Sequence, residues 1–280
     1  MSRVAVVTDS TCYLPAQLVR ECDIEVVPLQ VVIGGTAYDE GGETSSATVA
    51  QALRSWTPVT TSRPGPAAFA DAYERAAERG CDGVVSVHLS SKMSGTVESA
   101  ELAAKESPVR VEVVDSRSLG MGLGFAVLAA ARAALDGGTV DDVAGVARTR
   151  AAATAAIFYV DTLEHLRRGG RIGPAAALLG SALAVKPLLH LVDGHIEPLE
   201  KVRTSSRAIA RLEELAVEKA GSAAVDVAVH HLANPDRAES LAQRLLTRIR
   251  GLQDMHVSEV GAVVGAHVGP GMLAVVVAPR

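Results

Sequence analysis

The sequence has few aromatic residues, no excess of basic residues and no long apolar run. Three Phe, four Tyr and one Trp make up 3% of 280 residues, fewer than a protein that stacks nucleic-acid bases normally uses. Acidic residues outnumber basic ones by 32 to 27, so the net charge is −5. A nucleic-acid-binding protein usually carries the opposite sign. We therefore expect no nucleic-acid partner.

Cysteine is also scarce. The three residues Cys12, Cys22 and Cys81 form no C-x-x-C pair, which argues against a structural zinc site or a disulfide framework and favours a reducing compartment. Apolar runs such as residues 121–131 are shorter than the roughly 20 residues that span a bilayer. The apolar run near the N-terminus is too short for a signal peptide. These features predict a cytoplasmic protein with no membrane span and no metal.

The first half of the chain alternates between strand and helix patterns. Hydrophobic residues make up 48% and charged residues 21% of the sequence, which is ample for a folded core. Strand-type runs occur at residues 3–7, 26–33, 83–88 and 109–114, and helical patterns at 14–21, 66–79, from about 96, 122–135 and 140–152. This alternation predicts βαβ units and a parallel sheet.

The second half mixes hairpins with helices. Apolar runs at 184–192 and 195–203 flank Asp193-Gly194, which is a strong hairpin signal. Further strands are expected at 157–160, 225–230, 255–260, 261–267 and 272–278, and helices at 162–168, 205–220 and 235–250. We predict an α/β domain at residues 1–153 and a smaller α+β domain at 154–280.

Four hydroxyl-rich segments follow the expected strands, at residues 8–11, 60–62, 90–96 and 115–116. Ligands of open α/β sheets bind outside the carboxyl ends of the strands, so we expect the four segments to meet at one sheet edge. Hydroxyls and a helix N-terminus suit an anion, and Gly95 would let that anion approach the backbone closely. His267, among glycines, could donate a further hydrogen bond. Each segment could equally be an ordinary helix cap.

Enzyme motifs are incomplete. The glycines at 120–124 lack the third Gly of G-x-G-x-x-G, and neither a P-loop nor a G-x-S-x-G elbow occurs. A nucleophile–base pair of Ser94 with His88 or His267 stays open. The segment at 161–172 places several arginines around a helix C-terminus, where they could serve the helix dipole or face a phosphate or a partner.

The chain also resembles the DegV family of bacterial lipid-binding proteins. The resemblance runs from end to end and in order. It rests on residues 9–15, 26–29, 61–64, 89–96, 114–116, 161–172, 186–187 and 265–271. It implies an N-terminal parallel α/β domain followed by a smaller α+β domain, with a long-chain fatty acid held between them. Residues 1–153 would then carry the carboxylate-binding loops, and residues 154–280 would cover the acyl chain. In some members this lipid carrier serves a fatty-acid kinase, which phosphorylates the bound carboxylate.

The resemblance also implies roles for particular residues. Thr61, Ser62, Ser94 with Gly95, and His267 would meet the carboxylate, and Arg171 would lie where a kinase and phosphate approach. No catalytic residue and no cofactor is implied for this chain, and transient contact with a membrane stays open. Two departures touch the carboxylate loop, because Arg63 stands where Gln is common and Gly65 where Ser is frequent.

Two other functions remain alternatives. One is a stand-alone hydrolase or phosphotransferase that acts on a small anion through Ser94 and His267. The other is a regulatory binder for which the lipid is only a signal.

Overall fold

The chain folds into two compact units. The computed structural model describes residues 3–42, 45–178 and 186–280. One unit combines Met1–Gln30 with Ser62–Ala153, and the other combines Val31–Thr61 with Thr154–Arg280. Within the described residues, no helix combines the length and the apolar character needed to cross a membrane.

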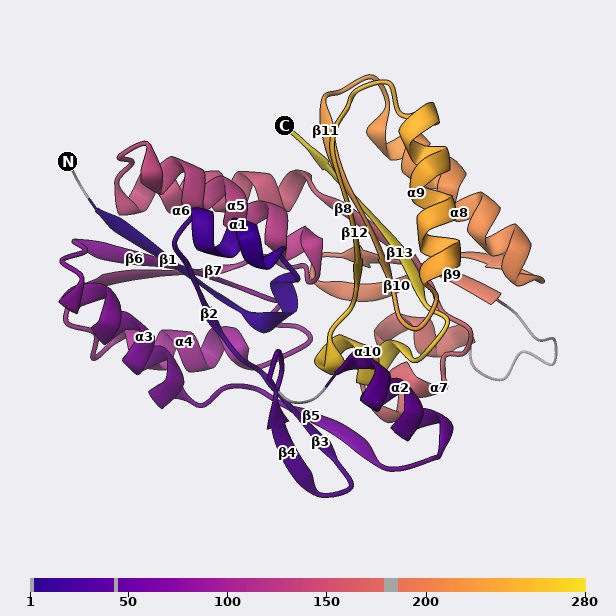
Figure 1. The fold of residues 1–280 in the computed structure, drawn as a ribbon, viewed down its shortest axis with the longest axis horizontal. Coiled ribbons are helices and arrows are strands. Elements are labelled where there is room, and N and C mark those ends of the chain that lie inside the picture. Colours follow the sequence, from indigo (N-terminus) through magenta and orange to yellow (C-terminus); the bar gives the residue numbers. More distant parts are fainter. Residues whose placement is uncertain (1–2, 43–44, 179–185) are drawn as a thin grey trace. The chain divides into compact units, whose positions relative to one another are not determined.

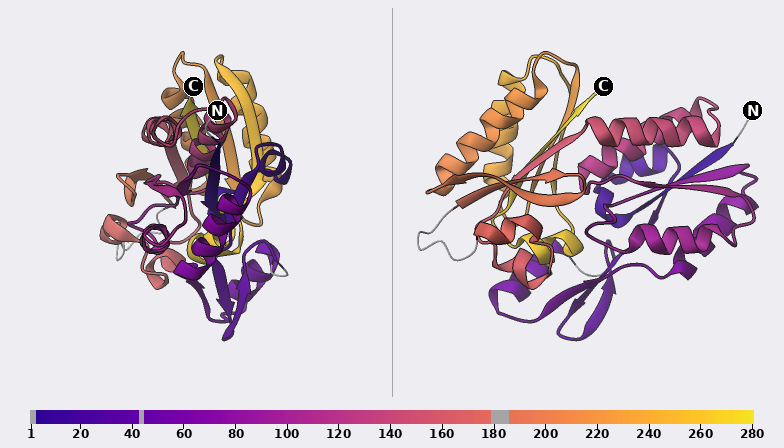
Figure 2. Two further views of the ribbon diagram at one scale, coloured as in Figure 1. Left: turned by 90° about the vertical axis from the view of Figure 1, so that its left-hand side faces the viewer. Right: turned by 180° about the vertical axis from the view of Figure 1, so that it is seen from behind.

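The first unit is a parallel sheet between two layers of helices (Figure 1). Its strands lie in the order β2-β1-β6-β7 and all pair in parallel. Helices α3 and α4 lie on one face and α5 and α6 on the other, as the rear view in Figure 2 also shows. The elements are β1 (Val4–Asp9), η1 (Ser10–Cys12), α1 (Ala16–Glu21), β2 (Ile24–Val27), α3 (Pro66–Glu78), β6 (Gly83–His88), α4 (Thr96–Ala104), β7 (Arg110–Asp115), α5 (Met121–Leu135) and α6 (Val140–Ala153).

Burial explains the pattern of the central strands. All six residues of β1 and of β6 are buried, as expected for strands covered on both faces. Ala5, Val7 and Val84 pack with Phe69 and Tyr73 of α3 in one apolar cluster. Burying a Val or Phe side chain contributes roughly 1.5–3 kcal/mol, so this cluster fixes β1 and β6 against α3.

The second unit is built on a six-stranded mixed sheet in the order β10-β9-β8-β13-β11-β12. Helices α8 and α9 pack on one face of this sheet around a large apolar cluster. The elements of the chain beyond residue 154 are β8 (Ala155–Tyr159), α7 (Glu164–Arg168), η2 (Gly173–Leu178), β9 (Lys186–Val192), β10 (His195–Val202), α8 (Ser205–Ala220), β11 (Val225–His231), α9 (Pro235–Arg248), β12 (Leu252–Glu259), α10 (Ala262–Val268) and β13 (Leu273–Pro279).

The predicted hairpin is confirmed. Strands β9 and β10 pair antiparallel, with His195 opposite Val192. Asp193 and Gly194 both have positive φ, 47° and 83°, as a type I′ turn requires. The start of the predicted strand, residues 184–185, lies outside the described residues.

The division at residue 153 needs a correction, because residues 31–61 belong to the second unit. This segment contains β3 (Gln30–Ile33), β4 (Thr36–Asp39), α2 (Ser46–Arg54) and β5 (Val59–Ser62). Its strands form a separate sheet in the order β4-β3-β5. Val31 and Val49 pack against Ala262 and Ala266 of α10. Burial against a distant part of the chain, which no local pattern reveals, therefore decides where the segment belongs.

The single run expected at 26–33 is two strands in two different sheets. Strand β2 ends at Val27 and β3 begins at Gln30. Pro28 between them has no N–H to donate to a strand ladder. The next amide, Leu29 N, donates instead to Ser10 Oγ at 3.0 Å. The apolar run thus divides at Pro28 and Leu29, where the backbone amide bonds a side chain instead of a neighbouring strand.

Candidate functional site

Three polar segments meet at one edge of the parallel sheet. Strands β1, β6 and β7 run parallel and end at Asp9, His88 and Asp115, so the segments 8–11, 90–96 and 115–116 lie at their carboxyl ends. The fourth segment, residues 60–62, ends strand β5 of a separate three-stranded sheet. The expectation of a common sheet edge is therefore correct for three segments, and it is wrong in giving residues 60–62 to a strand of the parallel sheet.

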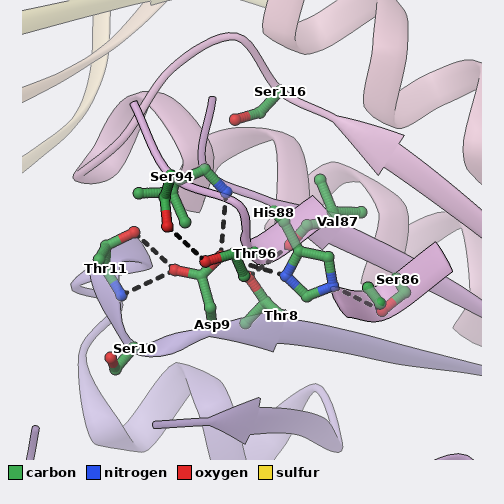
Figure 3. Close-up of polar contacts among 12 residues, drawn as sticks. Thr8, Asp9, Ser10, Thr11, Ser86, Val87, His88, Ser94, Thr96 and Ser116 are labelled. Atoms are coloured by element: carbon green, nitrogen blue, oxygen red, sulfur yellow. Dashed lines mark hydrogen bonds and ion pairs between the residues drawn. The ribbon is translucent and has the colours of Figure 1, made fainter. Parts of the chain in front are cut away.

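Asp9 is the centre of the hydrogen bonds at this edge (Figure 3). The residue is fully buried. Its Oδ1 accepts from the amide of Thr11 at 3.0 Å and from the Thr11 hydroxyl at 2.6 Å. Its Oδ2 accepts from Leu89 N at 2.9 Å and lies 3.1 Å from Nδ1 of His88. Buried charges are stable only when they are hydrogen-bonded, and Asp9 meets that condition fully.

The other ring nitrogen of His88 continues the chain of hydrogen bonds. Its Nε2 lies 2.7 Å from Ser86 Oγ, which accepts from the Tyr73 hydroxyl at 2.9 Å. Burial raises the pKa of Tyr73 to about 12, against a lowering by its bond to Ser86. The set Asp9–His88–Ser86 has the residue types of a hydrolase triad. However, Ser86 is completely buried, so this hydroxyl has no access to a substrate.

The same contacts bear on one of the nucleophile–base pairs that the sequence left open, Ser94 with His88. The two ring nitrogens of His88 face Ser86 and Asp9. Ser94 Oγ lies 2.9 Å from Thr96 Oγ1. Each side chain thus has partners other than the other one.

Gly95 is the N-cap residue of α4, and the space beside it is occupied by a neighbouring side chain. A Cβ at this position would overlap the guanidinium of Arg63. Arg63 Nη1 donates to the Gly95 carbonyl at 3.3 Å and to Glu98 Oε2 at 2.6 Å. Ser62, next to Arg63, is exposed and donates from Oγ to the Arg63 carbonyl at 3.2 Å. The space beside Gly95 thus accommodates Arg63, the departure noted in the carboxylate loop.

In the second unit the structure brings Thr61 and His267 together. Thr61 Oγ1 lies 2.8 Å from His267 Nε2, although the residues are 206 positions apart. His267 is on helix α10, not on the strand expected at 261–267. Short apolar runs fit either a strand or a helix, and here a distant side chain decides. The buried Glu40 accepts a hydrogen bond from Val263 N at 2.8 Å and so caps the first turn of the helix.

His267 lies in a tight, partly charged setting. A Cβ on Gly169 would overlap the Nδ1 atom of His267. Among the described residues, this Nδ1 is the buried side-chain polar atom that has no hydrogen-bond partner. Burial, and after it the positive charge of Arg171, lowers the pKa of His267 from 6.5 to about 4. Arg171 is held nearby through Nη1, which donates to the Gly169 carbonyl at 2.6 Å. His267 is therefore neutral at pH 7.

Glycines join segment 161–172 to segment 265–271. Besides the contact of Gly169 with His267, a side chain on Gly269 would overlap His165, and one on Gly271 would overlap Asp161. Gly269 and Gly271 also have φ of +75° and +91°, values that glycine adopts readily and that L-residues rarely adopt. The glycines of these two segments therefore serve close packing that holds His267 next to Arg171.

Sequence reasoning missed some of the residues that matter here. Nothing local identifies Glu40, which reaches across 223 positions to α10. The link from Asp9 to His88 spans 79 positions. Of these contacts, the sequence indicates only the cap in which the Asp9 side chain accepts from Thr11 N, because Asp is a common residue at a helix N-cap.

The geometry defines a class of site. Thr61 Oγ1 and a neutral imidazole, with the cation Arg171 close by, suit a bound anion that needs hydrogen bonds more than a charge partner. The described residues contain no group of three His, Cys, Asp or Glu side chains that could hold a metal ion. The chain is thus an α/β protein in which Thr61 and His267 form a polar pair beside Arg171.

Comparison with known proteins gives the family. The model of the DegV family, described as a family of uncharacterised proteins, matches residues 3–280. A DegV domain-containing protein of Streptomyces coelicolor is 62% identical, with all of both chains covered. The chain belongs to the DegV family.

Solved structures agree with this assignment. A fatty-acid-binding DegV family protein from Thermus thermophilus is 35% identical and superposes with a TM-score of 0.94, covering 99% of this chain and 100% of that one. DegV of Bacillus subtilis, described as a fatty acid binding protein, is 33% identical with a TM-score of 0.92, covering 100% of both chains. The expected fold class is therefore confirmed.

Proposed function

We propose that this chain binds a long-chain fatty acid and presents its carboxylate to a partner kinase. The observation that carries the proposal is the end-to-end likeness to the fatty-acid-binding proteins of T. thermophilus and B. subtilis. The pairing of Thr61 with a neutral His267 supports it, because these groups can hydrogen-bond a carboxylate.

We assign the head-group contacts to Thr61, Ser62, Ser94 with Gly95, and His267, which are the positions that the family resemblance indicates. An ionised head group removed from water needs such hydrogen bonds, since an unpaired buried charge is costly.

The acyl tail would supply most of the affinity. Each buried CH₂ contributes about 0.8 kcal/mol, so a chain of roughly 16 carbons binds tightly even when its head-group site is modest. The carboxylate, hydrogen-bonded but not neutralised, would keep a nucleophilic oxygen. In the kinase step this oxygen forms a bond to the γ-phosphorus of ATP, and ADP leaves. ATP would be bound by the partner, and this chain would itself be non-catalytic.

Arg171 is proposed to serve the approach of the kinase or the phosphate. It lies close enough to His267 to lower the pKa of the imidazole. A cation here would stabilise the added charge of a phosphorylated head group.

The first experiment is organic extraction of freshly purified protein and mass spectrometry of the extract. We expect near-stoichiometric long-chain fatty acid from the wild type and much less from His267→Gln. His195→Gln is the matched control, because His195 is exposed at the start of β10. A protein that holds no fatty acid and takes up neither added oleate nor palmitate would overturn the proposal.

The kinase role is tested separately. Lysate of the source organism is supplied with ATP and the palmitate-loaded protein, and acyl phosphate is trapped with hydroxylamine. We expect Arg171→Ala to retain palmitate but to yield less trapped product than the wild type. Equal product from both proteins would remove Arg171 from this role.

A further inference from the structure

The motif at Asp9–Thr11 has no part in the proposed head-group contacts, yet Asp9 is among the most heavily hydrogen-bonded side chains of the first unit. Its two oxygens accept from two different loops (Figure 3). Thr11 belongs to the loop after β1, and Leu89 begins the loop after β6. One buried carboxylate therefore ties together two loops at the ligand-binding edge of the sheet.

A short hydrogen-bonded path leads from Asp9 to Ser94. Leu89 N donates to Asp9, and the carbonyl of the next residue, Ser90, accepts from Met93 N at 3.0 Å and from Ser94 N at 3.1 Å. The backbone of Ser94 is thus held two steps away from the Asp9 carboxylate. A shift of Leu89 would move the residue that we assign to the head group.

A second path reaches the loop after β7. The Thr11 carbonyl accepts from Gly120 N at 2.8 Å, and Ser116 N donates to the His88 carbonyl at 3.0 Å. All three polar segments that meet at this edge therefore depend on residues bonded to Asp9.

Four groups face the Asp9 carboxyl and occupy its acceptor sites. They are the amide and hydroxyl of Thr11, the amide of Leu89 and Nδ1 of His88. In the tautomer that has its hydrogen on Nδ1, His88 Nε2 accepts from Ser86, whose oxygen accepts from Tyr73. In that tautomer every hydrogen of the network has an acceptor.

We infer that Asp9 is a positioning residue of the head-group site, which holds the Ser94 loop in its binding geometry through Leu89 and Thr11. The inference rests on the proposed function. It gives the motif at Asp9–Thr11 a role in affinity without any contact between Asp9 and the ligand.

The test compares two isosteric changes in the same network. Asp9→Asn turns one acceptor oxygen into an NH₂ group, which must face the donors of either Thr11 or Leu89. Tyr73→Phe removes the hydroxyl at the far end of the network, which donates to Ser86 Oγ at 2.9 Å and lies 3.5 Å from the Ala100 carbonyl, and it leaves Asp9 untouched. With palmitate as the probe, we expect Asp9→Asn to raise Kd by about tenfold or more. Tyr73→Phe should change it by less than about twofold, even where both lower Tm.

A milder pair keeps the inference testable when Asp9→Asn does not fold. Thr11→Val removes one of the four donors with little change in volume, and Thr11→Ser keeps the hydroxyl. We expect Thr11→Val to weaken palmitate binding several-fold and to speed hydrogen exchange of the Ser94 amide, and Thr11→Ser to restore both. Equal affinity and equal exchange in Thr11→Val and Thr11→Ser would overturn the inference.

Failure of the proposed function has a different signature. A wild-type protein that binds neither palmitate nor oleate contradicts fatty-acid binding. Exchange of the Ser94 amide in the Thr11 variants then still shows whether the Asp9 network holds this loop. A wild type that binds palmitate, with Asp9→Asn folded and binding equally well, contradicts only the role of Asp9.

Discussion

Gly169→Ala is the substitution whose effect follows most directly from the packing around His267. The φ of Gly169 is −74°, so the backbone accepts alanine without strain. The added Cβ would lie 2.7 Å from His267 Cε1 and closer still to Nδ1, whereas ordinary contact begins at 3.4 Å. The ring must therefore withdraw by at least 0.7 Å, the difference between these two distances.

The cost has two parts. Inserting a methyl group into a packed region costs typically about 1–3 kcal/mol, while alanine gains up to about 1 kcal/mol over glycine in helical backbone. We expect a net loss of about 1–2 kcal/mol in the free energy of unfolding. Withdrawal of the ring also disturbs the 2.8 Å bond to Thr61, so palmitate affinity should fall as well.

Gly145→Ala is the matched control, because the same atoms are added where nothing lies within 4 Å of the new Cβ. Gly145 is inside helix α6, so alanine should stabilise the protein by about 1 kcal/mol. Urea unfolding and palmitate titration of both variants measure the two effects. A Gly169→Ala protein as stable as Gly145→Ala, with unchanged palmitate affinity, would refute the close packing of Gly169 on His267.

Three further outcomes are expected. In the folded protein the pKa values of His230 and His267 are lowered from 6.5 to about 4, so as the pH falls these histidines are protonated in the unfolded chain before they are protonated in the folded one. The free energy of unfolding should therefore be full above pH 6.5 and fall toward pH 4, with a loss of up to about 2 kcal/mol per histidine at about pH 5. Urea unfolding above pH 6.5 and at about pH 5 measures this loss, and equal free energies of unfolding would contradict it. Thr61→Val, which removes the partner of His267 Nε2, should cost about 1–2 kcal/mol in urea unfolding and weaken palmitate binding; unchanged values would show that this bond is unimportant. Gly95→Ala displaces only the end of the flexible Arg63 side chain, so thermal unfolding should detect a loss below about 1 kcal/mol, and a larger loss would mean that Arg63 is held rigidly.

Local sequence patterns were sufficient for the elements of the parallel sheet. Strands β1 and β6 are short apolar runs that end in polar residues, and the structure has them at Val4–Asp9 and Gly83–His88. The hairpin at Asp193-Gly194 was equally clear, since only a few residue types tolerate positive φ at both turn positions. In each case the information lies within a few neighbouring residues.

Local sequence patterns were insufficient where a short apolar run fits both a strand and a helix. Residues 261–267 read as a strand, but they form α10 because Glu40 caps its first turn and Val49 packs on its apolar side. Residues 60–62 were assigned to the parallel sheet, although β5 pairs with β3. Both errors concern contacts with residues 31–61, a segment whose unit was itself misassigned.

The sequence by itself determined the alternation of strands and helices, the turn at Asp193-Gly194 and the types of side chain available to bind an anion. Only the tertiary structure decided that Thr61 meets His267, that Gly169 closes on the imidazole and that Asp9 ties two loops together. The physical reason is the range of the interactions. Backbone preferences act between near neighbours, whereas hydrogen bonds and packing act between any residues that folding brings within a few ångströms.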